Sequence, residues 1–132
     1  MKFRLLPSTI HDAFENMAID EAILRSVSEG KSPPTLRLYR WRPSAVSIGC
    51  FQGFDYEVDE ENVSSEGVDV VRRISGGGSV FHDYNGEITY SFISDLDHVP
   101  GDVLDSFRKV CEALVEGLEL LGLKAEYREL ND

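Results

Sequence analysis

Three consecutive glycines at residues 76–78 constrain the fold of this chain more than any other feature. Glycine destabilises the interior of a helix or a strand, so residues 75–79 must form a loop. The loop directly follows residues 68–73, an apolar run that ends in two arginines and predicts a buried strand. A loop without side chains lets a ligand contact the backbone and leaves N–H groups free to face an anion. The sequence therefore predicts a candidate ligand-binding loop at a strand end.

Hydrophobic patterns on both sides of this loop predict a mixture of strands and helices. Strands are expected at residues 2–6, 35–40, 44–48, 68–73 and 87–93, with Pro7 ending the first. Helices are expected at residues 11–28, at the acidic stretch 55–66, and from residue 101 until Gly122. Asp12 is the expected N-cap of the first helix, with Glu15 completing a capping box. This order favours an α+β fold, a mixed sheet with packed helices, over residues 1–132.

Length and composition exclude several classes of protein. The chain has 132 residues, enough for one domain, with 24 acidic and 13 basic side chains and a net charge of −11. Such an acidic protein is not expected to bind nucleic acid through bulk charge. Neither a signal peptide nor an apolar run of about 18 residues is present, which predicts a cytoplasmic protein without a membrane segment. Cys50 and Cys111 form neither a zinc pattern nor a disulfide framework.

The residues around the glycine loop are the candidates for chemistry. Arg72 and Arg73 offer planar, permanently charged donors that suit a phosphate or a carboxylate, and strand alternation points only one of them into the site. His82 could orient a ligand, although a structural role with a hydrogen bond to a carbonyl is the favoured interpretation. Known phosphate-loop patterns are missing. From the residues alone, an anion- or nucleotide-binding loop and a hairpin turn with incidental arginines both remain open.

Residues 72–83, RRISGGGSVFHD, resemble the signature RRxxGGGAVxHD of the lipoate–protein ligases. Three other segments follow the order found in that family: residues 16–22, residues 42–52, and residues 130–132 with the pair Asn131-Asp132. On these motifs the chain is identified as a member of the lipoate–protein ligase A family. It would form the N-terminal portion of a biotin/lipoate A/B protein ligase catalytic domain.

The resemblance implies an activity, co-substrates and partners. Such enzymes use ATP and Mg²⁺ to convert lipoate into lipoyl-adenylate. They transfer the lipoyl group to a lysine on a carrier domain of a 2-oxo-acid dehydrogenase complex or of glycine cleavage protein H. Asp132 would reach the magnesium ion, since a carboxylate suits this hard cation. The residues that the family match places at the adenylate are Arg73, Ser75, Gly76, Gly77, Gly78, Ser79, His82, Asn131 and Asp132.

Residues 85–91, NGEITYS, depart from the ligase pattern. They are closer to the E-L/I-T-Y-S motif of the octanoyltransferases, which share the fold and carry acyl groups on a cysteine without ATP. Those enzymes usually replace the third glycine, which this chain keeps as Gly78. The ligase is therefore the main prediction, and the octanoyltransferase is the alternative.

A second departure concerns the catalytic residues. In both branches an acyl-polarising lysine, and in the transferases the cysteine nucleophile, follow the Asn-Asp pair. Lys124, Cys50 and Cys111 do not correspond to them. The resemblance therefore predicts a catalytic domain that is either truncated or completed by a second, C-terminal chain. A non-catalytic ligand-binding module is the remaining alternative.

Overall fold

A computed structural model describes residues 2–99 and 101–128 of the chain. The chain divides into two units, Met1–Ser94 and Asp95–Asp132. Among the described residues, the first unit contains six strands and three helices, and the second contains one long helix. The predicted α+β class is confirmed.

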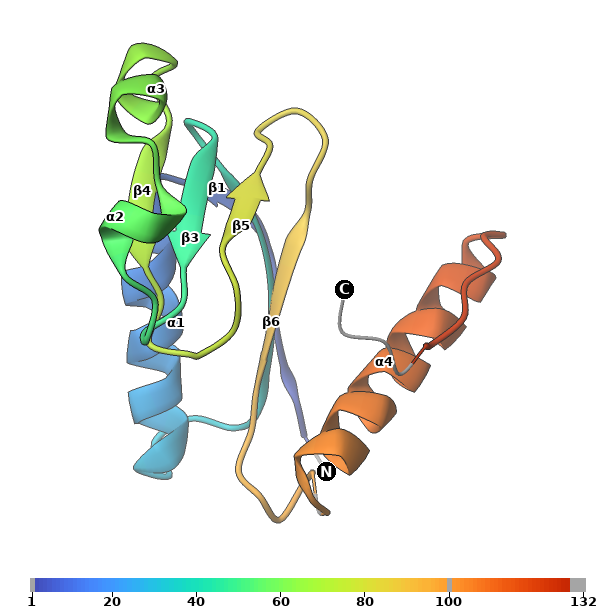
Figure 1. Cartoon of the computed structure of the whole chain (residues 1–132). Helices are drawn as coiled ribbons and strands as arrows, with labels where there is room; N and C mark the ends of the chain where they lie inside the picture. The colour runs from blue at the N-terminus through green and yellow to red at the C-terminus, as the bar shows by residue number, and fades with distance from the viewer. Residues whose placement is uncertain (1, 100, 129–132) are drawn as a thin grey trace. The chain divides into compact units, whose positions relative to one another are not determined.

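The strands of the first unit form two three-stranded sheets where we expected one mixed sheet (Figure 1). One sheet has the order β1-β2-β6, with β1 parallel and β6 antiparallel to β2. The other has the order β4-β3-β5, with β4 parallel and β5 antiparallel to β3. Both sheets are thus mixed. The strands are β1 (Arg4–His11), β2 (Thr35–Trp41), β3 (Ala45–Ile48), β4 (Asp69–Arg72), β5 (Val80–His82) and β6 (Thr89–Ile93).

Pro7 does not end the first strand, so the prediction of a strand confined to residues 2–6 is wrong. β1 continues to His11, with an irregular register between Leu6 and Thr9. It lies at the edge of its sheet. Proline is tolerated there because one row of backbone N–H groups on an edge strand has no partner strand. β5 was not predicted, since three residues are too short to show an alternating pattern.

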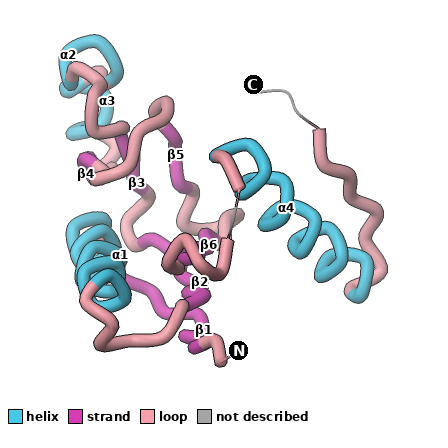
Figure 2. The backbone as a smooth tube through the Cα atoms, turned by 90° about the horizontal axis from the view of Figure 1, so that it is seen from below, coloured by secondary structure: helices cyan, strands magenta, loops and turns pink. Residues whose placement is uncertain are grey.

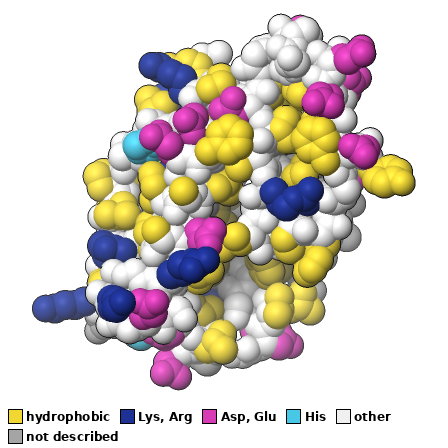
Figure 3. All heavy atoms as spheres, turned by 90° about the vertical axis from the view of Figure 1, so that its left-hand side faces the viewer, with side chains coloured by type: hydrophobic (Ala, Val, Ile, Leu, Met, Phe, Trp, Pro, Cys, Tyr) yellow, Lys and Arg dark blue, Asp and Glu magenta, His cyan; other side chains and the backbone are white. Residues whose placement is uncertain are grey.

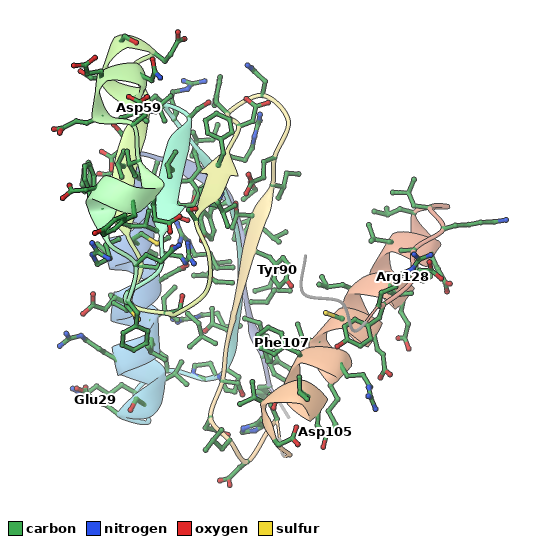
Figure 4. All side chains as sticks on the ribbon, viewed as in Figure 1. Glu29, Asp59, Tyr90, Asp105, Phe107 and Arg128 are labelled. Carbon is green, nitrogen blue, oxygen red and sulfur yellow. The ribbon has the colours of Figure 1, made fainter. Side chains whose placement is uncertain are left out.

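The first long helix, α1 (Ala13–Ser28), begins as predicted. The side chain of its N-cap Asp12 accepts a hydrogen bond from the backbone N–H of Glu15 at 2.8 Å. The acidic stretch forms two short helices where one was expected, α2 (Phe54–Glu57) and α3 (Glu60–Ser65). The break lies at Asp59, whose side chain caps α3 (Figure 4). Exposed acidic side chains are visible along the upper part of the face in Figure 3.

α1 packs against strands of both sheets, and Figure 2 shows it beside β1, β2 and β6. Two buried hydrophobic clusters lie along the helix. One contains Ala13, Tyr39, Trp41, Ala45 and Val71, and the other contains Ile23, Val27 and Ile93. The apolar side chains of α1 are only partly buried, because Phe14 is 60% exposed and Leu24 is 42% exposed. Phe14 instead borders the candidate site described below.

The second unit consists mainly of α4 (Val103–Leu120), with Asp102 as its N-cap. Gly122 follows the helix with a positive φ of 80°, which fits the predicted stop. The apolar face of α4 and residues 125–128 border a groove of about 750 Å³ that includes Phe107 and Arg128 (Figure 4). Within the described ranges, no helix is both long and apolar enough to cross a membrane.

Candidate functional site

A pocket of about 490 Å³ lies in the first unit, bordered by α1, β2, β6 and the glycine loop. Its apolar lining includes Phe14, Met17, Tyr39, Trp41, Val71 and Val80. Three of the predicted site residues, Arg73, Ser75 and His82, also line it. The other predicted residues of the loop, 76–79, lie outside this lining. Asn131 and Asp132 lie outside the described residues, so their predicted roles stay predictions.

Arg73 clamps the glycine loop against β3. Its Nη1 donates to the backbone O and to the Oγ of Ser47, both at 2.8 Å. Its Nη2 donates to the carbonyl oxygens of Gly76 at 3.1 Å and Gly78 at 2.8 Å. In a trans peptide the N–H points opposite to the preceding carbonyl, so the N–H groups of Gly77 and Ser79 point away from the arginine. The clamp therefore orients the donors of the loop but also occupies both terminal nitrogens of Arg73.

Arg72 and Ser79 also bind within the protein. Arg72 is exposed, yet its Nη1 donates to the carbonyl oxygens of Gly49 at 3.0 Å and Gln52 at 2.6 Å. Both arginines line the pocket, although strand alternation predicted only one. The Ser79 hydroxyl donates to Glu57 Oε2 at 2.7 Å. The side chains expected to bind an anion are thus largely committed to the loop and its neighbours.

Gly49 and Gly77 make the closest backbone approach in the site. A Cβ atom at Gly49 would lie 2.2 Å from the carbonyl oxygen of Gly77, where no real side chain fits. Gly77 has a φ of +100°, which favours glycine, and its Cβ would lie 3.3 Å from Arg73 Nη2. A Cβ at Gly78 would meet open space. The geometry therefore requires glycine at positions 49 and 77, but it does not require glycine at position 78.

His82 is buried, and both of its ring nitrogens are hydrogen-bonded. Nε2 lies 2.8 Å from Ser47 Oγ, and Nδ1 lies 2.8 Å from Glu87 Oε1. The ring stacks on Trp41 with centroids 4.0 Å apart and an interplanar angle of 14°. The expected hydrogen bond to a backbone carbonyl is therefore replaced by side-chain partners. These contacts hold the imidazole rigidly in the pocket wall.

The segment that departs from the ligase pattern carries a row of polar side chains, of which Thr89 and Ser91 line the pocket. Glu87, Thr89 and Ser91 are two residues apart, so they face the same side of the backbone. Thr89 Oγ1 accepts a hydrogen bond from Trp41 Nε1 at 2.7 Å, and Ser91 Oγ donates to Asp20 Oδ1 at 2.9 Å. The octanoyltransferase-like residues are thus integrated into the site.

The structure adds a buried polar layer that the sequence analysis did not predict as part of the site. The side chain of Arg37 is 2% exposed. Its Nη1 donates to Asp20 Oδ1 at 2.8 Å, and its Nη2 donates to Asn16 Oδ1 at 2.6 Å. Asp20 lines the pocket. The sequence carried a signal for this layer, because Arg37 occupies an inward position of β2 between Thr35 and Tyr39, where an unpaired charge would be costly.

Tyr39 belongs to the same layer, and its hydroxyl donates to Asp20 Oδ2 at 3.0 Å. Burial, reinforced by the negative charge of Asp20, raises the pKa of the Tyr39 phenol well above its ordinary value near 10. A group whose pKa is raised by folding contributes stability that is fully present below its unfolded-state pKa. This contribution is lost as the pH rises above about 10, because the unfolded chain then loses the proton first.

We expect the Tyr39→Phe variant to show a weaker decline in stability above pH 10 than the parent. The parent should lose up to about 1.4 kcal/mol of unfolding free energy per pH unit through this group. Urea unfolding at a series of pH values measures the effect. Tyr56→Phe is the matched control, because Tyr56 is 92% exposed. Parallel plots of unfolding free energy against pH for the parent and Tyr39→Phe would contradict the assignment of the raised pKa to Tyr39.

The described residues contain no group of three or more His, Cys, Asp or Glu side chains that could hold a metal ion. Cys50 and Cys111 are free and half-buried. Neither lines the pocket, so the described residues do not give the pocket a thiol nucleophile.

A mixed α+β unit with an arginine-clamped glycine loop beside a largely apolar pocket is suited to bind an apolar chain that ends in a polar group. The family model "Lipoyl protein ligase A/B catalytic domain" matches residues 12–132. The chain belongs to this family of catalytic domains, which confirms the resemblance inferred from the glycine loop.

Two similar curated relatives are octanoyltransferases. The octanoyltransferase LipM of Moorella thermoacetica is 44% identical over 94% of this chain and 45% of its own length. That of Kyrpidia tusciae is 45% identical over 95% of this chain and 46% of its own length. The chain therefore spans less than half the length of these relatives.

Two similar solved structures are ligases. A lipoate-protein ligase A bound with ATP is 39% identical, with a TM-score of 0.85 over 100% of this chain and 52% of that one. A bi-partite lipoate protein ligase from Thermoplasma acidophilum, described with its E2 lipoyl domain, is 35% identical. It has a TM-score of 0.77 over 100% of this chain and 50% of that one.

Proposed function

We propose that this chain forms the acyl-binding part of an octanoyltransferase catalytic domain. The reaction would move an octanoyl group from the thioester of an acyl carrier protein to a lysine of a lipoyl carrier domain. The ATP-dependent ligase, the main prediction from the sequence, is supported less well than this alternative. The curated relatives named above are octanoyltransferases.

The polar row of residues 87–91 carries the proposal. This is the segment in which the sequence departs from the ligases, and its side chains hold His82, Trp41 and Asp20 in the pocket wall. A transferase-like sequence at this position therefore belongs to the site itself. The geometry does not require glycine at position 78, because a side chain would fit there without a clash. The presence of Gly78 therefore no longer favours the ligase over the octanoyltransferase.

The contacts of Arg73 are a further observation that bears on the choice between the two reactions. A phosphate group is well bound where a guanidinium offers two free N–H donors side by side. In Arg73 both terminal nitrogens are already bound to backbone carbonyls or to Ser47. Arg73 itself therefore offers a phosphate no free pair of N–H donors, and we assign no step to ATP or Mg²⁺.

In the proposed reaction, the apolar lining would take up the octanoyl chain, and its burial would supply much of the binding energy. A thiolate nucleophile would attack the thioester carbonyl, and the thiol of the carrier would leave. The lysine amine of the acceptor would then attack the new thioester, form the amide and release the nucleophilic thiolate. The resemblance assigns the nucleophile to the segment that follows Asn131 and Asp132 in the relatives, outside the described residues.

The test uses the protein translated from its complete reading frame, octanoyl carrier protein and a lipoyl domain as acceptor. We expect mass spectrometry to show one octanoyl group added to the acceptor without ATP. An acceptor with arginine in place of the target lysine is the control. Modification that requires ATP and free lipoate or octanoate would overturn the proposal in favour of the ligase. Binding of an octanoyl thioester without any transfer would favour the ligand-binding module.

A further inference from the structure

A continuous chain of hydrogen bonds connects β6 to the glycine loop. At the β6 side, Trp41 Nε1 donates to Thr89 Oγ1 at 2.7 Å, and Thr89 Oγ1 donates to Glu87 Oε1. The same Glu87 oxygen lies 2.8 Å from His82 Nδ1. The chain continues from His82 Nε2 to Ser47 Oγ and on to Arg73 Nη1, with both distances 2.8 Å.

The ends of this chain determine the direction of each bond. An indole and a guanidinium can only donate, and a carboxylate can only accept. Thr89 Oγ1 accepts a hydrogen bond from the indole N–H of Trp41, so its own hydroxyl proton is donated to Glu87. A neutral His82 then carries its proton on Nδ1, directed to Glu87, and its Nε2 accepts from Ser47. Ser47 Oγ in turn accepts from Arg73.

Ser47, His82 and Glu87 have the distances of a nucleophilic triad, but Ser47 is not placed to attack a substrate. Although Ser47 borders the pocket, its accessible surface is 0%, and its hydroxyl oxygen already accepts a hydrogen bond from Arg73. His82 is 6% exposed, with both nitrogens occupied. An array that transfers protons to a substrate needs one end open to it. This array is closed at both ends by protein groups.

We infer that Glu87 and His82 are positioning residues that hold the Arg73 clamp and, through it, the glycine loop. Glu87 sets the position of the His82 proton, which directs the Ser47 hydroxyl proton to Nε2 and leaves a lone pair of Ser47 for Arg73. Arg73 then holds the carbonyls of Gly76 and Gly78 with its other nitrogen. The transferase-like segment would thus determine the conformation of a loop that lies apart from it in the sequence.

Two variants of Glu87 distinguish a role as hydrogen-bond acceptor from a role that needs its negative charge. Glu87→Gln keeps an oxygen acceptor, and Thr89, which donates to the same atom, would hold that oxygen toward His82. Glu87→Met removes the acceptor at similar volume. A positioning role therefore predicts that Gln substitutes for Glu and that Met does not. A charge relay to the reaction would make both variants inactive.

The first measurement does not depend on the reaction. The ¹⁵N shifts of the His82 ring in the parent and in Glu87→Gln should report the Nδ1–H form. Glu87→Met should lose that signature and show faster amide exchange at residues 76–79. Unfolding curves establish that each variant is folded. An Nε2–H ring in the folded parent, or an unchanged loop in Glu87→Met, would overturn the inference.

The second measurement rests on the proposed function. In octanoyl transfer, Glu87→Gln should stay within about threefold of the parent kcat/KM, and Glu87→Met should lose about 10- to 100-fold. Ser47→Ala should keep partial activity, because Arg73 retains the backbone oxygen of Ser47. Complete loss in both Ser47→Ala and Glu87→Gln, with an intact loop, would overturn the positioning role in favour of a reactive triad. If the parent transfers no octanoyl group, the proposed function fails while the NMR result still decides the inference.

Discussion

Gly49→Ala is expected to lower octanoyl transfer by about 100-fold, because a displacement of about 1 Å at a reacting group has effects of this size. The added methyl group would lie 2.2 Å from the carbonyl oxygen of Gly77, so β3 and the glycine loop must separate. Gly49 is buried, and no flexible side chain can yield to the methyl group. Overpacking of this kind also costs about 1–3 kcal/mol of unfolding free energy. Steady-state kinetics and urea unfolding measure the two effects.

Gly78→Ala is the matched control for this prediction. It adds the same methyl group to the loop itself, but into open space and without a positive φ. Transfer should remain within about threefold of the parent, since no atom has to move. Equal losses in the two variants would show that the loop requires glycine for a reason other than its contact with β3.

Arg37→Ala is expected to destabilise the protein by about 3–5 kcal/mol, the usual consequence of removing one member of a buried ion pair. The Arg37 side chain is 2% exposed and binds both Asp20 and Asn16. Its removal would leave the carboxylate of Asp20 without its cation and open a cavity between the two hydrophobic clusters. Urea unfolding of the variant and the parent measures the difference in unfolding free energy.

Arg25→Ala tests whether this effect depends on burial. Arg25 pairs with Glu21 at 2.6 Å on the surface of α1, and its side chain is 74% exposed. An exposed pair of this type contributes about 0.5 kcal/mol or less. A similar loss of stability in both variants would contradict the buried polar layer as the source of the effect.

Much of the fold could be predicted from local patterns. The start of α1 at Asp12 and the loop at residues 75–79 depend on neighbours in the chain, so the sequence was sufficient for them. β1 beyond Pro7 and the short strand β5 were missed. Whether proline is tolerated depends on its place in a sheet, and three residues of β5 become a strand only by pairing with β3.

The candidate site was predicted in part. Arg73, Ser75 and His82 line the pocket, and their predicted contacts with a bound adenylate stay predictions. Asp20 and Arg37 were not predicted as site residues, because these two residues lie 17 positions apart and pair only when α1 packs on β2. The arginine of the motif was interpreted as an anion ligand, while its contacts make it a clamp on the backbone.

The sequence by itself determined the family, the α+β class and the position of the loop, since each depends on residue types at short spacing. Only the tertiary structure decided what each side chain of the motif contacts. It showed that Gly49 is required by a backbone approach and Gly77 by its positive φ, and that glycine is not required at position 78. It also joined Glu87 to Arg73 through His82 and Ser47. The physical reason is that a donor has many acceptors within reach in an unfolded chain, and folding selects among them.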